Sequence, residues 1–66
     1  MKLAINGQEE NLPDITTIEG VLDHYGIAGG RIAVEQNGEI IKRGDWSVTE
    51  VTDGDRLEIV HFKGGG

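Results

Sequence analysis

The sequence predicts a small α+β domain in which one main helix packs across a mixed sheet of about five strands. Three observations support this fold class. Short segments alternate between apolar and polar residues, Asn-Gly pairs separate several of these segments, and one apolar stripe with helical spacing follows the first pair of segments. A chain of 66 residues suffices for one such domain and is too short for two.

The first segments predict a β-hairpin. Residues 2–5 alternate in polarity, Asn6-Gly7 is a strong signal for a two-residue turn, and residues 8–12 can return as the second strand. Pro13 ends this strand because it has no N–H group to donate to the sheet. The hairpin therefore precedes the helix in the chain.

A short helix is predicted after the hairpin. Thr16 and Glu19 have the spacing of a capping box, in which the two residues satisfy free N–H groups at the helix start. The apolar stripe that follows consists of Ile18, Val21, Leu22 and Tyr25. Gly20 lowers the helix propensity, so we expect close packing against the sheet at this position, and Gly26 is a natural helix end.

A second hairpin-like pair follows the helix. Residues 31–36 alternate as a strand does, Asn37-Gly38 predicts the turn, and residues 39–42 return. Residues 43–52 form a polar connection. We expect three apolar side chains to hold this connection to the core: Trp46, Val48 and Val51.

The last strand is predicted at residues 56–62, after a turn formed by Asp53-Gly54-Asp55. Its apolar residues occur at both even and odd positions, which indicates burial on much of both faces and a place in the middle of the sheet. The order of hairpin, helix, second pair and final strand is the β-grasp pattern. A five-stranded barrel of the OB type is the alternative, but its strands are longer than these segments.

Composition and charge exclude several classes of partner. Six basic and 12 acidic residues give a net charge of −6 and a pI near 4.6, which opposes binding to nucleic acid or to an anionic membrane. The chain has no cysteine, and no apolar run approaches the ~18 residues of a membrane span. We expect a cytoplasmic protein without disulfides or a thiolate metal site.

The sequence contains no clear catalytic or metal-binding pattern. The two histidines, His24 and His61, have no partner at a spacing that would define a site. Asp53-Gly54-Asp55 lacks the later ligands of a calcium loop and is better explained as a turn. We therefore expect a protein that is not an enzyme and that binds no metal or cofactor of its own.

The C-terminal end carries the strongest functional signal. Gly64, Gly65 and Gly66 follow the last strand, so we predict a domain over residues 1–63 and a flexible tail over residues 64–66. Because glycine has no Cβ, such a tail can enter a narrow channel, and three residues project roughly 10 Å. This reach can deliver a terminal carboxylate to another protein's active site. A tail without function, frayed or left from cloning, is the alternative.

These features occur together in one known family. They are the short length, the Asn6-Gly7 hairpin, the helix over residues 16–25, the Asp53-Gly54-Asp55 turn before Leu57-Glu58-Ile59-Val60, and the end Gly64-Gly65-Gly66. Over its whole length, the chain resembles the ThiS family, the sulfur carriers of thiazole biosynthesis, which belong to the ubiquitin-like β-grasp class. The combination of turn, last strand and terminal glycines is the most specific element of this resemblance.

The resemblance implies how the tail is used. An adenylating enzyme of the ThiF type would use ATP and Mg²⁺ to convert the α-carboxylate of Gly66 to an acyl-adenylate, while Gly64 and Gly65 thread the channel. Sulfur from a donor system, for example a cysteine desulfurase, would then replace AMP on the carbonyl carbon of Gly66. The resulting thiocarboxylate would deliver sulfur to thiazole synthase, ThiG, and the chain would be a cosubstrate. Many members end in Gly-Gly, so Gly65 is the acceptor if Gly66 is an appended residue.

The last strand also predicts a docking surface. Leu57 and Ile59 lie on one face of this strand, whereas Glu58, Val60 and Phe62 share the other. We predict that the second set is exposed and docks both enzymes, with a strand covered on both faces as the alternative. The net negative charge predicts a basic partner surface and binding that weakens as the salt concentration rises.

Three other functions remain open at this point. The small subunit of molybdopterin synthase is also a glycine-ended sulfur carrier, but it is typically somewhat longer. A ubiquitin-like modifier would form an isopeptide bond with a lysine, and a binding-only β-grasp module would have an idle tail. The length and the tight Asp-Gly-Asp spacing favour the thiazole branch.

Overall fold

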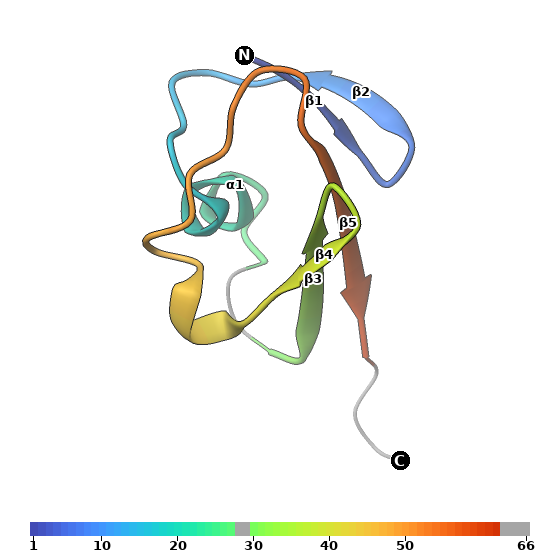
Figure 1. Cartoon of the computed structure of the whole chain (residues 1–66), viewed down its shortest axis with the longest axis vertical. Helices are drawn as coiled ribbons and strands as arrows, with labels where there is room; N and C mark the ends of the chain where they lie inside the picture. Colours follow the sequence, from blue (N-terminus) through green and yellow to red (C-terminus); the bar gives the residue numbers. More distant parts are fainter. Residues whose placement is uncertain (28–29, 63–66) are drawn as a thin grey trace.

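The computed structural model describes residues 1–27 and 30–62, and in this part of the chain one sheet packs against one α-helix (Figure 1). The elements, in chain order, are β1 (Lys2–Ile5), β2 (Gln8–Asn11), α1 (Ile18–His24), β3 (Ile32–Gln36), β4 (Glu39–Ile41), the 3₁₀ helix η1 (Arg43–Asp45) and β5 (Arg56–His61). Each predicted strand is present within a few residues of its expected ends. No helix among the described residues has the length and apolar character needed to cross a membrane.

The sheet is mixed, as predicted, and has the strand order β2-β1-β5-β3-β4. One hairpin pairs β1 with β2, a second pairs β3 with β4, and β5 lies between the two hairpins. β5 runs parallel to β1, with Ile5 opposite Leu57, and antiparallel to β3, with Val34 opposite Ile59. The last strand in sequence is thus the central strand in space, and the linear order differs from the closed barrel of the OB alternative.

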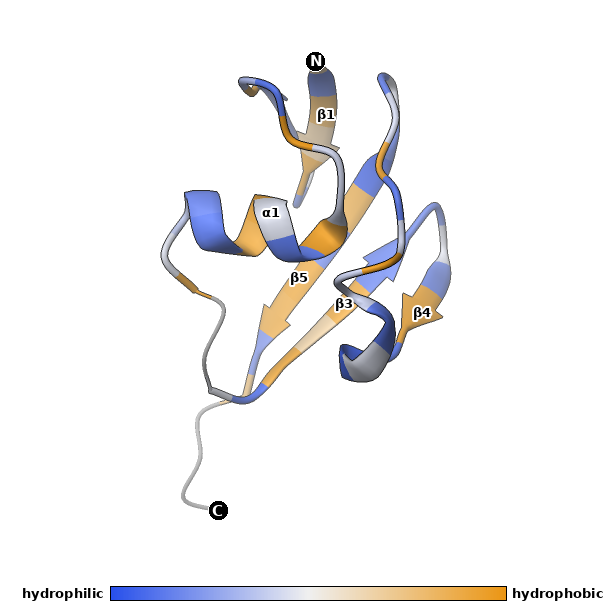
Figure 2. Cartoon of the chain, turned by 90° about the vertical axis from the view of Figure 1, so that its left-hand side faces the viewer, coloured by the Kyte–Doolittle hydropathy of each residue, from blue (hydrophilic) through white to orange (hydrophobic). Residues whose placement is uncertain are grey.

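The hydrophobic core lies between α1, which crosses one face of the sheet, and the strands beneath it (Figure 2). Its buried residues are Leu3, Leu12, Ile15, Ile18, Val21, Leu22, Val34, Trp46, Val51, Leu57 and Ile59. Burial of one large aliphatic side chain stabilises the fold by about 1.5–3 kcal/mol. Because these residues come from β1, α1, β3, β5 and the connections between the elements, the core joins both hairpins to the helix.

The start of α1 differs from the prediction by one residue. Thr17 is the N-cap, and its Oγ1 accepts a hydrogen bond from the Gly20 N–H at 3.1 Å. Thr16 is exposed, and its carbonyl oxygen accepts a hydrogen bond from Val51 N–H at 2.9 Å. The predicted capping box between Thr16 and Glu19 is therefore wrong, because pairing with the later connection keeps the chain extended through Thr17.

The apolar stripe of α1 is narrower than predicted. Its buried residues are Ile18, Val21 and Leu22. Tyr25 is the C-cap and is 40% exposed, and Gly26 has a φ of +71°, which suits the predicted helix end. Gly20 does lie in a tight place, but a Cβ there would be 2.9 Å from Ile15 Cγ2. The close approach is thus to the segment before the helix and not to the sheet.

The connection between β4 and β5 is held to the core at two of its three predicted positions. Trp46 and Val51 are buried, and the Trp46 Nε1–H donates to the Ile41 oxygen at 3.0 Å. The Arg43 guanidinium lies 4.7 Å from the Trp46 ring centre, a cation–π distance. The prediction for Val48 is wrong, since Val48 is 72% exposed. Helical turns continue beyond η1, so a residue two positions after Trp46 faces away from the core.

Both predicted Asn-Gly turns connect hairpin strands. Asn6 and Asn37 have positive φ values of 51° and 52°, and the glycine after each also has a positive φ. These backbone angles are typical of type I′ turns, whose twist matches that of the flanking strands. The local sequence therefore predicts both turns correctly.

Candidate functional site

The candidate site begins where β5 ends. β5 occupies the centre of the sheet and leads the chain to the sheet margin (Figure 1). Gly64, Gly65 and Gly66 lie outside the described residues, as does Lys63, so the roles assigned to the tail stay predictions. The described residues around the end of β5 show which surfaces the domain offers beside that tail.

The outer face of β5 carries the predicted docking patch, which we call the outer-face patch and define as Glu58, Val60 and Phe62. All three residues are exposed, Val60 to 49% and Phe62 to 56%. On the other face of the strand, Leu57 and Ile59 are buried. The expectation of burial on much of both faces is therefore wrong, because α1 covers only one face of the sheet. The exposure that docking requires is present, and the docking itself stays a prediction.

Neighbouring strands extend the outer-face patch. Glu35 of β3 lies opposite Glu58, and Ile40 of β4 lies opposite Glu35 and is 70% exposed. Sequence analysis did not single out Ile40, because Ile40 and Ile41 are both apolar and only the pairing register decides which of them faces outward. Like charges directly opposite each other are unfavourable in a sheet. Arg56 of this chain lines the same surface hollow as Glu35 and Glu58 and places a basic group beside them.

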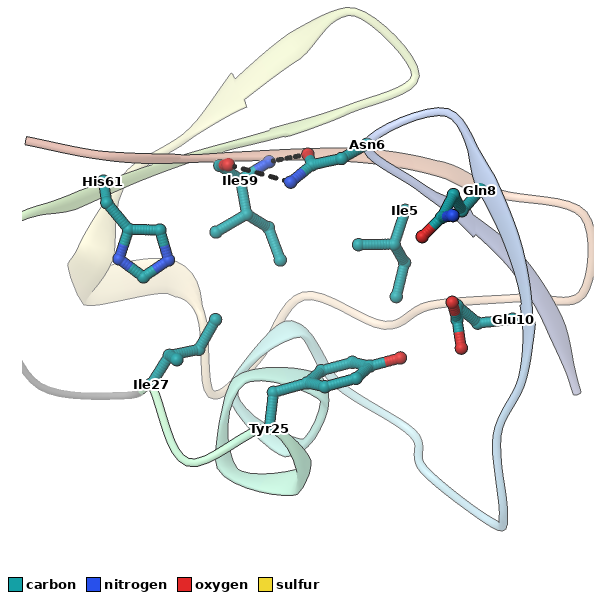
Figure 3. A pocket seen from close by; sticks show the side chains of 8 residues that line it. All are labelled: Ile5, Asn6, Gln8, Glu10, Tyr25, Ile27, Ile59 and His61. Atoms are coloured by element: carbon teal, nitrogen blue, oxygen red, sulfur yellow. Dashed lines mark hydrogen bonds between the residues drawn. The ribbon is translucent and has the colours of Figure 1, made fainter.

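A concave surface, which we call the groove, lies on the helix side of the sheet (Figure 3). Its walls are formed chiefly by Ile5, Ile27, Ile59, Tyr25 and His61. The volume is about 370 Å³, and Glu10 lies at the rim near the Tyr25 hydroxyl. Burial raises the pKa of Tyr25, and the charge and hydrogen bonding of Glu10 raise it further. Sequence analysis did not find this groove, because its walls come from three separate segments of the chain: the first hairpin, the end of α1 and β5.

Asn6 connects the β1–β2 turn to β5. Its Oδ1 accepts a hydrogen bond from the Ile59 N–H at 2.7 Å, and its Nδ2–H donates to the Ile59 oxygen at 3.2 Å (Figure 3). The side-chain amide thus pairs with β5 as a peptide group of a neighbouring strand would. The sequence identifies Asn6 as a turn residue but carries no signal for this contact with a residue 53 positions away.

Asp55 fixes the start of β5. Its carboxylate accepts hydrogen bonds from the Thr52 N–H and Oγ1 at 2.8 and 3.1 Å, from Asn37 Nδ2 at 3.1 Å and from Gln36 Nε2 at 3.0 Å. Partial burial by itself raises the pKa of Asp55, but the hydrogen bonds outweigh it and lower the pKa below its ordinary value of 3.8. Asp55 therefore acts as a structural anion. Among residues 1–27 and 30–62, no group of three or more His, Cys, Asp or Glu side chains could hold a metal ion.

The model of the ThiS family matches residues 2–66. This chain belongs to the ThiS family. A ThiS structure of similar fold is the crystal structure of the thiamine biosynthesis protein from Geobacter metallireducens, which covers 100% of both chains with a TM-score of 0.85 and 32% identity. The similarity to this ThiS structure confirms the predicted β-grasp fold.

Two curated relatives of this ThiS chain differ in length. The sulfur carrier protein ThiS of Bacillus subtilis is 38% identical over 65 residues, which are 97% of this chain and 98% of that protein. The thiazole synthase of Paramagnetospirillum magneticum is 46% identical over 66 residues, which are 100% of this chain and 20% of that protein. This chain therefore spans about a fifth of the length of the thiazole synthase relative.

Proposed function

We propose that this chain is a sulfur carrier of thiamine biosynthesis and that the α-carboxylate of Gly66 carries the sulfur. The observation that carries the proposal is the match to the ThiS family, which spans residues 2–66 and so includes the terminal glycines. The Bacillus subtilis relative of nearly equal length is named a sulfur carrier protein. Because the chain has no cysteine, it cannot hold sulfur as a persulfide, which leaves the terminal carboxylate as the acceptor.

The proposed reaction begins with activation, because a carboxylate is a poor electrophile. An adenylating enzyme of the ThiF type, with ATP and Mg²⁺, joins a carboxylate oxygen of Gly66 to the α-phosphorus of ATP, and pyrophosphate leaves. Sulfide from the donor system then attacks the acyl carbon, and AMP leaves with the bonding electrons, which gives the thiocarboxylate directly. If the donor instead presents a persulfide, the attack gives an acyl disulfide, and a thiol reductant must cleave its S–S bond to release the thiocarboxylate. The thiocarboxylate passes its sulfur to thiazole synthase. The partner enzymes supply the catalytic groups, and this chain is their cosubstrate.

The described part of β5 supports this role because it attaches the C-terminal segment to the hydrophobic core. Leu57 and Ile59 anchor the strand in the core, and Asn6 binds the main chain of Ile59. The chain from His61 to Gly66 can span roughly 17 Å when extended. A partner can thus hold the folded domain at its surface while the terminal carboxylate enters an active site inside the partner.

The outer-face patch is the proposed docking surface for these enzymes. Val60 and Phe62 offer exposed apolar area next to Glu58, and the chain carries a net charge of −6. This combination favours a partner surface with apolar and basic groups, and association that slows and weakens as ionic strength rises. Thiazole synthase is the partner with the most direct support, because a protein of that name contains a segment similar to this whole chain.

Intact-mass spectrometry tests the proposed function. The protein is incubated with the adenylating enzyme, ATP, Mg²⁺ and a sulfur source, and the product is alkylated and fragmented. We expect one oxygen to be replaced by sulfur at Gly66, and only when ATP is present. An unchanged C-terminus, with an enzyme preparation that modifies another ThiS protein, would contradict the proposal. Conjugates to lysine that survive denaturation would instead indicate a ubiquitin-like modifier.

A chain that lacks Gly66 is the matched control for this experiment. If Gly66 is the functional end, the shortened chain should not restore growth of a thiamine auxotroph, although it should keep the melting temperature of the full chain. Growth restored by the shortened chain would identify Gly65 as the acceptor. Growth restored in a molybdenum-cofactor mutant but not in the thiamine auxotroph would assign the carrier to the molybdopterin branch.

A further inference from the structure

One stretch of strand edge is open beside the groove. The Phe62 N–H donates to the Arg31 oxygen at 2.9 Å, so the main-chain groups of Phe62 face the β3 side. These groups alternate in direction along a strand. The main-chain N–H and C=O of Ile59 and His61 therefore face the opposite side, which is the side of β1.

The strand on that side ends before it reaches His61. β1 pairs with β5 only as far as Ile5, which lies opposite Leu57, and the Asn6 amide then satisfies the main chain of Ile59. No described residue hydrogen-bonds the main-chain N–H or C=O of His61 from that side. Among residues 1–27 and 30–62, the end of β5 therefore presents an unpaired strand edge in line with β1.

The two outer edges of the sheet differ from this unpaired edge. β2 consists only of polar residues, with the sequence QEEN, and β4 is only three residues long. Charged side chains and short strands are common means by which sheet edges avoid further pairing. The unpaired edge at His61 lacks such protection among the described residues, and it borders the apolar groove.

We propose that an extended segment of thiazole synthase pairs with β5 at His61 and places an apolar side chain in the groove. Alternate side chains of a strand added in line with β1 would point to the helix side of the sheet. Ile5, Ile27 and Ile59 lie on that side, and the groove volume of about 370 Å³ accommodates one large side chain. Hydrogen bonds at His61 would provide affinity, and the groove would select the side chain.

Thiazole synthase is the chosen occupant for two reasons, and this choice rests on the proposed function. First, a relative of that name contains a segment similar to the whole of this chain, so domain and synthase occur in one polypeptide there. Second, a segment bound at His61 would set the direction of the chain just before the tail. This would guide Gly66 into the active site that accepts the sulfur.

The sharpest test compares His61→Pro with His61→Ala. Both variants lose the imidazole, but only proline lacks the N–H that the added strand would use. We expect the fold to tolerate proline at this position, because the His61 N–H does not face β3. We expect His61→Pro to weaken binding to purified thiazole synthase about three- to tenfold relative to His61→Ala, in agreement with the loss of one hydrogen bond. Equal affinities of two folded variants would overturn the proposal.

Amide hydrogen exchange of the wild-type protein gives an answer even if His61→Pro does not fold. Adding thiazole synthase should slow exchange at His61, whereas the N–H of Val60, which already faces β3, should change little. Unchanged exchange at His61, protection by the adenylating enzyme instead, or protection by self-association at high protein concentration would each overturn the proposal. Thiocarboxylate formation at Gly66 is measured separately in the wild-type protein and in Val48→Ala, whose substituted side chain lies outside the groove, and should be normal in both. Its absence in the wild-type protein would count against the proposed function.

A second pair of variants tests the groove. Tyr25→Ala removes one wall of the groove and should weaken synthase binding at least about threefold. Val48→Ala removes an exposed apolar side chain that does not line the groove and should leave the affinity unchanged. If the two substitutions have the same effect, the groove does not receive a side chain of the synthase.

Discussion

Two Asn-Gly turns with nearly the same backbone geometry hold β5 in different ways. Asn6 and Asn37 have φ values of 51° and 52°. Asn6 forms part-buried hydrogen bonds with both main-chain groups of Ile59. Asn37 forms exposed ones, from its Nδ2 to the Asp55 carboxylate and from the Arg56 N–H to its Oδ1. The same dipeptide therefore forms the same turn, while its amide works in two different environments.

The difference in exposure affects stability, because water can take the place of a lost partner at the exposed Asn37 but less well at the part-buried Asn6. A group that loses its partner in an exposed place bonds to water, so the net loss is small. A group that loses its partner at a partly buried place keeps part of its desolvation cost. Asn6 should thus stabilise the fold more than Asn37, although nothing in the two turn sequences distinguishes them.

The largest effect is expected for Asn6→Gly. Glycine adopts positive φ readily, so the turn is kept and the substitution removes mainly the side-chain amide. We expect the free energy of unfolding to fall by about 2–3 kcal/mol, because both main-chain groups of Ile59 lose their partner. Urea denaturation followed by the fluorescence of Trp46 measures this change.

Asn37→Gly should have a smaller effect, about 1 kcal/mol in the same measurement, because its hydrogen bonds are exposed. Both variants introduce one glycine and so raise the entropy of the unfolded chain by a similar amount. The difference between the two losses therefore isolates the contribution of burial. Equal losses would contradict the comparison.

The Asp55 carboxylate makes the Asn37 end of β5 sensitive to acid. Its pKa is lower in the folded protein than the ordinary value of 3.8, so its contribution to stability is present above that value. This contribution is lost as the pH falls through the folded pKa. We expect the melting temperature of the wild-type protein to drop more below pH 3.8 than that of Asp55→Asn. If the melting temperatures of the two proteins fall by the same amount as the pH is lowered, Asp55 has no such role.

Phe62→Ala should have the smallest effect on stability and provides a baseline for the two turns. Phe62 is 56% exposed on the outer face, so we expect a change within about 0.5 kcal/mol in the free energy of unfolding. Binding to the partner enzymes should nevertheless weaken, and the wild-type affinity should decrease with added salt. A folded variant with unchanged affinity for both enzymes would exclude Phe62 from the docking surface.

Local patterns predicted most of the fold but failed where contacts between distant segments decide. The turns at Asn6 and Asn37 were predicted from residue propensity alone. The central position of the last strand was predicted correctly, but from an expected burial of both faces that the structure does not show. Thr17 replaced the predicted N-cap Thr16 because of pairing with residues around Val51. Val48, which looked like a core residue, faces solvent because the connection continues in helical turns.

The features of the candidate site also fall into two groups, those that the sequence predicts and those that depend on contacts between distant segments. The glycine tail and the outer-face patch are readable from sequence, since a Gly-Gly-Gly end is a local feature and alternate residues of a strand share a face. The groove and the unpaired edge at His61 cannot be predicted from the sequence, because they depend on where β1 ends relative to β5.

The sequence by itself thus determined the kinds of element, their order, the turns and the C-terminal group that the family would use. Short-range steric preferences and residue periodicity set these properties. The tertiary structure alone decided which end of β5 has an open edge, which asparagine amide is part-buried and which face of the sheet stays exposed. These properties depend on pairing register and on the single helix that covers one face, and both arise from contacts between residues that are far apart in the chain.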